Sequence, residues 1–126
     1  MSDRATFDAD VLDTLRSRQE VGIRTSRNQR RPVTIWIVVA DDAVFVRSVR
    51  GPQGKWYLAA RADGEATLVI DQRELPVRVT WATDPASVAA ASQAILSKYA
   101  TSPYARVMVS DEIVPTTLRL EPRRQN

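Results

Sequence analysis

The stretch that decides the fold runs from residue 33 to residue 49 and reads VTIWIVVADDAVFVRSV. Its first part, residues 33–39, is rich in β-branched side chains and apolar on both faces, which predicts a central strand covered on each side. Asp41 and Asp42 form a tight-turn signal, and residues 44–49 then predict the returning strand of a hairpin. We therefore expect an antiparallel β-structure built around this hairpin.

The returning strand carries an arginine in apolar company. Alternation along the strand places Arg47 between Phe45 and Val49 on one face. Such an arginine needs an anionic partner or access to water. Eight arginines but only three acidic residues lie between positions 16 and 50. Because the guanidinium is a fixed fork of donors that suits phosphate and carboxylate, this cluster indicates an anionic partner.

The rest of the chain predicts further strands and helices joined by short turns. Further strands are expected at residues 20–25, 66–70, 75–82 and 116–120, and residues 104–109 show a weaker strand pattern. Helices are expected within residues 1–19, at residues 55–61, and from the cap Asp84 and Pro85 to about Tyr99. Residues 122–126 form a basic tail. Together these elements predict one α+β domain over residues 1–126, a mostly antiparallel six-stranded β-barrel with two or three flanking helices.

Composition limits the chemistry and the location. The chain has 126 residues, 44% of them hydrophobic, which suffices for one core. Charged residues make up 26% of the chain and interrupt every apolar stretch, so we expect a soluble protein that does not enter a membrane. The polar N-terminus lacks the apolar region of a secretory signal, which favours a cytoplasmic location.

Cysteine and histidine are both absent. Their absence removes thiol nucleophiles, disulfides, the usual metal ligands and the commonest general base, so we predict no metal site. If the protein is an enzyme, we expect an organic cofactor to carry the chemistry. The sequence assigns no catalytic residue.

Three stretches resemble a known family. Residues 23–35, with a basic turn leading into Pro32, look like its first two strands; residues 44–51 look like its third strand and phosphate-contacting loop; residues 54–66 look like its tryptophan-containing helix and the next strand. The family is the flavin- or deazaflavin-binding split β-barrel superfamily, similar in fold to pyridoxamine-phosphate oxidase, and in particular its small actinobacterial members without a known function. The resemblance implies a split β-barrel, commonly a homodimer with the cofactor at the subunit interface.

The resemblance also implies a site for flavin mononucleotide (FMN) or a deazaflavin coenzyme. A flavin phosphate needs fixed cationic donors together with hydroxyl or backbone N–H donors. If the strands that carry Arg24 and Arg47 pair, their side chains converge near one end of the barrel. The expected cofactor-binding residues are Arg24, Thr25, Arg27, Arg47, Ser48, Arg50, Gly51, Lys55 and Trp56.

Each of these side chains also has a purely structural interpretation. The arginines can coat the surface of the sheet and pair with Asp41, Asp42 or Glu65. Trp56 can fill the core, which is the favoured interpretation, or wall a ring pocket. The strand residues Trp36 and Trp81 are expected in the core.

We expect an oxidoreductase that transfers hydride between the cofactor and a small organic substrate. Two alternatives from other classes remain. One is a cofactor-binding or carrier module without turnover, and the other is a weak nucleic-acid binder that uses the basic stretch. Mutation of Arg47 to alanine is expected to weaken cofactor binding without unfolding the domain.

Overall fold

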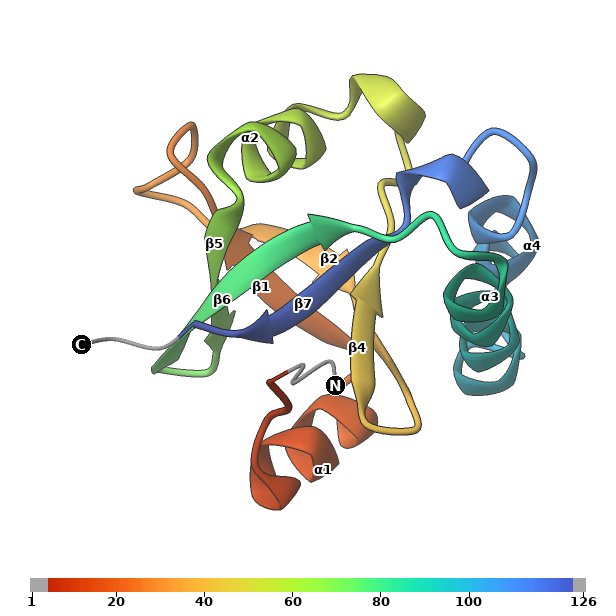
Figure 1. The fold of residues 1–126 in the computed structure, drawn as a ribbon, viewed down its shortest axis with the longest axis horizontal. Helices are drawn as coiled ribbons and strands as arrows, with labels where there is room; N and C mark the ends of the chain where they lie inside the picture. The colour runs from red at the N-terminus through yellow and green to blue at the C-terminus, as the bar shows by residue number, and fades with distance from the viewer. Residues whose placement is uncertain (1–4, 124–126) are drawn as a thin grey trace.

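The computed structural model describes residues 5–123, which fold into a nearly closed antiparallel β-barrel (Figure 1). Seven strands of this part of the chain pair in the order β2-β1-β5-β6-β7-β4-β3. The strands are β1 (Glu20–Arg24), β2 (Val33–Trp36), β3 (Val38–Ala40), β4 (Ala43–Val46), β5 (Glu65–Ile70), β6 (Arg73–Trp81) and β7 (Leu118–Pro122). Because β2 and β3 stand at the two ends of this order, one seam of the barrel is unsealed. The predicted α+β class is confirmed, with one strand more than expected.

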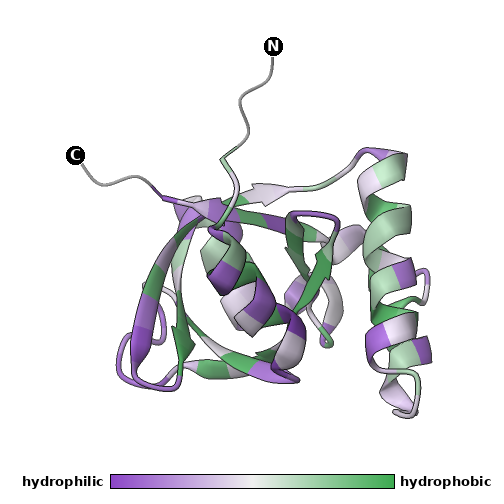
Figure 2. Ribbon diagram, turned by 90° about the horizontal axis from the view of Figure 1, so that it is seen from below, coloured by the Kyte–Doolittle hydropathy of each residue, from purple (hydrophilic) through white to green (hydrophobic). Residues whose placement is uncertain are grey.

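Helices cover the barrel on several sides. The helical segments are α1 (Ala9–Ser17), η1 (Gly51–Gln53), α2 (Lys55–Asp63), α3 (Pro85–Lys98), α4 (Tyr104–Met108) and η2 (Val114–Thr116). Figure 1 shows α1 and α2 at opposite ends of the barrel, and Figure 2 shows α1 lying across one of these ends. The helix α3 packs beside β3 and stands outside the barrel in both views. Within residues 5–123, no helix combines the length and apolar character needed to cross a bilayer.

Two hydrophobic clusters lie on opposite sides of β4. Val44 and Val46 point into the barrel interior, where they join residues such as Leu68 and Leu118. Phe45 points the other way, into a second cluster between the barrel wall and the helices α3 and α4. The predicted alternation along β4 is therefore confirmed, and Arg47 continues the face of Phe45.

The expected central strand at residues 33–39 is wrong, because the chain is broken at Ile37 into the two edge strands β2 and β3. The side chain of Tyr99 accepts a hydrogen bond from the Ile37 N–H (3.2 Å), and Lys98 donates one to the Ile37 carbonyl (2.7 Å). Both backbone groups of Ile37 are thus bonded to side chains at the end of α3. At this bend the chain passes from β2, on one side of the unsealed seam, to β3 on the other side.

Two further expectations are wrong. Residues 104–109 were expected to form a strand, but residues 104–108 form the helix α4, because Ala105 and Met108 lie three residues apart and both bury in the second cluster. Trp81 was expected in the core, but it is 48% exposed at the last residue of β6. Its indole N–H donates to the Pro115 carbonyl (2.7 Å), and the Arg61 guanidinium covers its ring at 4.0 Å.

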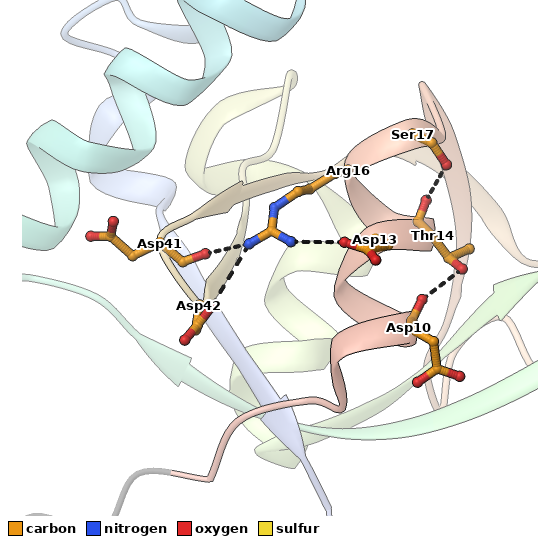
Figure 3. Close-up of polar contacts among 7 residues, drawn as sticks. All are labelled: Asp10, Asp13, Thr14, Arg16, Ser17, Asp41 and Asp42. Atoms are coloured by element: carbon orange, nitrogen blue, oxygen red, sulfur yellow. Dashed lines mark hydrogen bonds and ion pairs between the residues drawn. The ribbon is translucent and has the colours of Figure 1, made fainter.

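An arginine of the basic stretch joins α1 to the turn between β3 and β4 (Figure 3). One Arg16 nitrogen donates to the Asp13 carboxylate (3.2 Å), and the other donates to the Asp41 carbonyl (2.9 Å) and lies 3.7 Å from the Asp42 carboxylate. Arg16 therefore forms ion pairs with Asp13 and Asp42 and fixes α1 to this turn. The predicted N-terminal helix is α1, which has Asp8 at its N-cap, while residues 1–4 and residues 124–126 of the basic tail lie outside the described residues.

Candidate functional site

A cavity of about 320 Å³ lies at the barrel seam, and we call it the seam cavity. All four residues of β2 line it. Because successive residues of a strand point to opposite faces, a cavity that touches all four runs along the edge of that strand. This edge is open, since β2 pairs only with β1. The lining residues are Glu20, Val33, Thr34, Ile35, Trp36, Arg47, Val49, Arg50, Trp56, Tyr104 and Met108.

The indole of Trp36 forms one wall of the seam cavity, and the ring of Tyr99 packs against it. Its ring stacks on the Tyr99 ring, with centroids 3.8 Å apart and planes 2° from parallel. The Tyr99 hydroxyl donates to the Gln19 carbonyl (2.6 Å). Burial raises the pKa of Tyr99 to about 12, so its hydroxyl stays neutral near pH 7. The stack therefore holds a flat aromatic surface against the seam cavity.

Trp56 and Tyr104 supply two more aromatic side chains from separate helices. Trp56 of α2 is only 9% exposed and belongs to the barrel core, yet it also lines the seam cavity. Trp56 therefore fills the core, the interpretation favoured from the sequence, and its role as the wall of a ring pocket stays a prediction. Tyr104 of α4 is 61% exposed and lies at the rim.

Arg47 places a buried positive charge beside the seam cavity. It is 2% exposed, and its guanidinium donates to the Thr117 hydroxyl (2.8 Å) and to the carbonyls of Met108 (2.9 Å) and Val88 (3.0 Å). These three acceptors are uncharged, and within residues 5–123 no carboxylate forms an ion pair with Arg47. Burial lowers the pKa of Arg47 to about 10, which leaves it charged near pH 7. The cavity thus has a cationic side that favours an anion.

Two exposed charged residues complete the lining. Arg50 precedes the helix η1, and Glu20 is the first residue of β1. Glu20 is the one carboxylate among the described residues of the lining. Within residues 5–123, no three His, Cys, Asp or Glu side chains are grouped so that they could hold a metal ion.

The predicted convergence of Arg24 with Arg47 through strand pairing does not occur. The strand β1 pairs with β2 and β5, whereas β4 pairs with β3 and β7. Arg24 and Thr25 line a separate polar hollow of about 680 Å³, and Arg24 donates to the Glu74 carboxylate (2.7 Å). This bond lowers the pKa of Glu74. Thr25 is buried, and its side chain bonds to the side chain of Asn28.

Of the remaining predicted residues, Ser48, Gly51 and Lys55 lie shortly before or at the start of α2, whereas Arg27 lies between β1 and β2. Arg27 and Lys55 are exposed and line neither hollow. Gly51 has φ +75°, a left-handed conformation that favours glycine, and its N–H donates to the Ser48 carbonyl (2.9 Å). Ser48 is fully buried beneath this loop, and within the described chain its hydroxyl has no hydrogen-bond partner.

Of the nine predicted cofactor residues, the structure brings Arg47, Arg50 and Trp56 together at the seam cavity. Sequence reasoning missed Glu20, Trp36 and Tyr104 as lining residues. Trp36 was interpreted as a core residue because it lies in an apolar strand. The sequence does not show that this strand lies at the edge of the sheet.

A family model matches residues 11–120, nearly the whole described chain. Its family is described as an uncharacterized protein conserved in bacteria, DUF2255. The chain belongs to this family. No curated protein matches this DUF2255 chain. Its fold is similar to the crystal structure of the conserved hypothetical protein Rv2991 from Mycobacterium tuberculosis, with a TM-score of 0.66 and 13% identity, covering 98% of this chain and 85% of that one. At this identity the likeness shows the fold alone.

Proposed function

We propose that the seam cavity binds FMN or a deazaflavin coenzyme, and that the protein transfers hydride between this cofactor and a small organic substrate. The observation that carries the proposal is the meeting of Arg47, Arg50 and Trp56 in one aromatic-walled cavity. The volume of about 320 Å³ lies at the lower end of the range for small-molecule sites. The resemblance of residues 23–35, 44–51 and 54–66 to the split β-barrel superfamily also supports this choice.

The aromatic side chains suit the ring system of the cofactor. A flat heterocycle gains from stacking or edge contacts with aromatic rings. Trp36 is held flat by Tyr99, and Trp56 is fixed by the barrel core, so both surfaces exist before a ligand arrives. The open edge of β2 adds backbone groups beside them.

The start of α2 suits the phosphate. This helix has Gly54 at its N-cap, with no side chain to cap the first N–H groups. The N-terminus of a helix attracts anions through its free N–H groups and its dipole. Arg50 lies just before this end and Lys55 begins the helix, so two cations flank it. These residues would hold the phosphate, next to the side of the cavity that Trp56 lines.

The chemistry is then divided between cofactor and protein. The bound cofactor would supply the hydride chemistry, which amino-acid side chains do not provide. The protein orients the ring between aromatic walls and limits access of water to it. The uncompensated charge of Arg47 stabilises negative charge that develops on a bound ring or substrate.

Cofactor titration tests the proposal. We expect tryptophan fluorescence to be quenched by FMN or by a deazaflavin coenzyme with a Kd below about 100 μM. Arg50→Ala removes an exposed cation and should weaken binding about tenfold, the usual size of one charge-assisted contact. Arg73→Ala, also an exposed arginine but at the start of β6, serves as the matched control and should bind like the wild type.

Two outcomes contradict the proposal: no quenching below about 100 μM with either cofactor, or equal effects of the two arginine variants. Tight binding without reduction or oxidation of the cofactor by any of a panel of small substrates would instead indicate a carrier module.

We also infer that a second copy of the chain covers the mouth of the seam cavity. Val33 is 36% exposed, Val49 is 54% exposed, and both line the cavity. A ligand site usually buries most of its ligand, and this cavity is open along an unpaired strand edge. A homodimer formed across this edge would close it.

Sedimentation at micromolar concentration should therefore give the mass of a dimer. Val49→Asp places a charge in the proposed interface and should yield monomers. Leu58→Asp alters an exposed apolar residue of α2 outside the lining and should leave the dimer intact. A monomeric wild type would contradict the inference.

A further inference from the structure

The charged side chains that line the seam cavity are not paired with one another. Glu20 supplies the carboxylate of the described lining, and Arg47 and Arg50 supply the cations. Within residues 5–123, none of these three side chains forms an ion pair, although other arginines of the chain do. Opposite charges therefore stand apart in one lining, where a ligand can meet an acceptor and a donor at separate places.

Trp36 lies between the carboxylate and one of the cations. In the pair formed by β1 and β2, Glu20 is the register partner of Trp36. On the other side, Trp36 and Arg47 both line a second, narrow hollow of about 10 Å³, whose lining does not include Glu20. The order along this wall is thus carboxylate, indole, guanidinium. A flat ring stacked on Trp36 would meet an acceptor at one edge and a donor at the opposite edge.

The open edge of β2 adds backbone donors and acceptors to the same wall. All four residues of β2 line the seam cavity, and β2 pairs only with β1. In an antiparallel pair, every second residue of an edge strand directs both its N–H and its carbonyl away from the partner strand. The wall therefore offers a backbone donor and acceptor side by side, which match a ring edge that carries both a carbonyl and an N–H.

We propose that the Trp36 side of the seam cavity binds a planar heterocycle with an aminopyrimidinone edge, as in pterins and guanine. In such a ring the amino group and the neighbouring ring N–H are parallel donors, so the two oxygens of the Glu20 carboxylate accept from both. The Arg47 guanidinium has five N–H groups and donates three hydrogen bonds within the described chain, which leaves two for acceptors of the ring. The inference rests on the proposed function only in making this heterocycle the small organic substrate.

The same carboxylate disfavours rings that have an imide edge. Such an edge has one N–H between two carbonyls, as in lumazine or in the isoalloxazine ring of a flavin. A carbonyl oxygen directed at Glu20 is repelled, and one oxygen of the carboxylate loses its donor. This selection assigns the Trp36 side to the substrate and leaves the Trp56 side, next to the start of α2, to the cofactor.

Pterin and lumazine are matched probes of this edge, because lumazine has a carbonyl where pterin has its amino group. Each is titrated into cofactor-free protein by isothermal calorimetry at neutral pH. We expect the wild type to bind pterin at least about tenfold more tightly, since lumazine loses one charge-assisted hydrogen bond. Glu20→Gln should bring the two Kd values within about threefold, because an amide offers one acceptor and one donor instead of two acceptors. Glu112→Gln, at an exposed glutamate outside the lining, should keep the tenfold preference.

Three results would overturn the inference: no binding of pterin below about 1 mM, equal affinity of the wild type for both probes, or an unchanged preference in Glu20→Gln. The cofactor titration is a separate measurement on the same protein. Binding of pterin that depends on Glu20, in a protein that binds neither FMN nor a deazaflavin, would refute the proposed function and retain this site. Cofactor binding without a preference for pterin would refute this inference alone.

Discussion

Arg47→Ala is expected to lower the free energy of unfolding by about 2–4 kcal/mol, because the substitution removes three hydrogen bonds from a buried position. The guanidinium joins β4 to the helices α3 and α4 through the carbonyls of Val88 and Met108, and to the segment before β7 through Thr117. Alanine leaves both carbonyls without this donor and opens a space in a packed region. Removing a desolvated charge offsets only part of this loss.

Urea denaturation at neutral pH measures this effect. Arg73→Ala changes an exposed arginine and should shift the free energy of unfolding by less than about 0.5 kcal/mol. Arg47→Met keeps much of the side-chain volume, so the difference between the methionine and alanine variants separates packing from hydrogen bonding. If Arg47→Ala is as stable as Arg73→Ala, the three bonds contribute nothing measurable and Arg47 is free to serve a ligand alone.

The expected effect of Arg47→Ala on stability decides which variant can test ligand binding in the seam cavity. From the sequence, Arg47→Ala was expected to weaken cofactor binding without unfolding the domain. The structure gives Arg47 a part in both the fold and the cavity lining, so loss of binding in that variant would not identify a ligand contact. Arg50 is exposed and lines the same cavity, which makes it the more informative position.

Local signals in the sequence predicted many of the elements. The cap at Asp84 and Pro85 is present, with the Asp84 side chain accepting a hydrogen bond from the Ser87 N–H (3.0 Å). The turn at Asp41 and Asp42 is present too, with Asp41 in the left-handed region at φ +55°. Both features depend on residues only a few positions apart, so short stretches of the sequence are enough to predict them.

Features set by distant residues were not predictable in this way. The break at Ile37 depends on Lys98 and Tyr99, which lie about sixty positions away in the chain. The apolar pattern of residues 33–39 gives no information about these two residues, so it predicts one continuous strand. Residues 104–109 were mistaken for a strand because a segment this short fits both periodicities until its buried partners are known.

The candidate site was predictable only in part for the same reason. Strand alternation correctly placed Arg47 on the face of Phe45, away from the barrel interior. Alternation does not say which strands are neighbours, and β5 rather than β4 lies beside β1. Arg24 and Arg47 were predicted for one site, but they are found in different hollows. Arg24 ends β1, as a strand residue, whereas β4 ends at Val46 and Arg47 lies just after it, so the strand expected over residues 44–49 is shorter than predicted.

Gly54→Ala is expected to destabilise the fold by about 1–3 kcal/mol through a steric clash. The backbone at Gly54 has φ −58° and ψ 131°, which any residue adopts, so conformation does not require glycine here. Space does: a Cβ at this position would lie less than 3.0 Å from the Ser48 hydroxyl oxygen, which is fully buried. Because Gly54 is the N-cap of α2 and Trp56 follows two residues later, tryptophan fluorescence should report any displacement.

A double-mutant cycle with Ser48→Ala identifies the cause. Ser48→Ala alone removes a buried hydroxyl that has no partner among the described residues, so it should be neutral or slightly stabilising. In the double variant, the new Cβ of residue 54 would meet the Cβ of residue 48 at 3.5 Å, an ordinary contact. Stability should then return close to that of the wild type, giving a coupling energy of about 1–3 kcal/mol in urea denaturation. If Gly54→Ala is equally destabilising with serine or alanine at position 48, the hydroxyl is not the obstacle and the steric explanation is wrong, because the other neighbours of the new Cβ lie at ordinary contact distances.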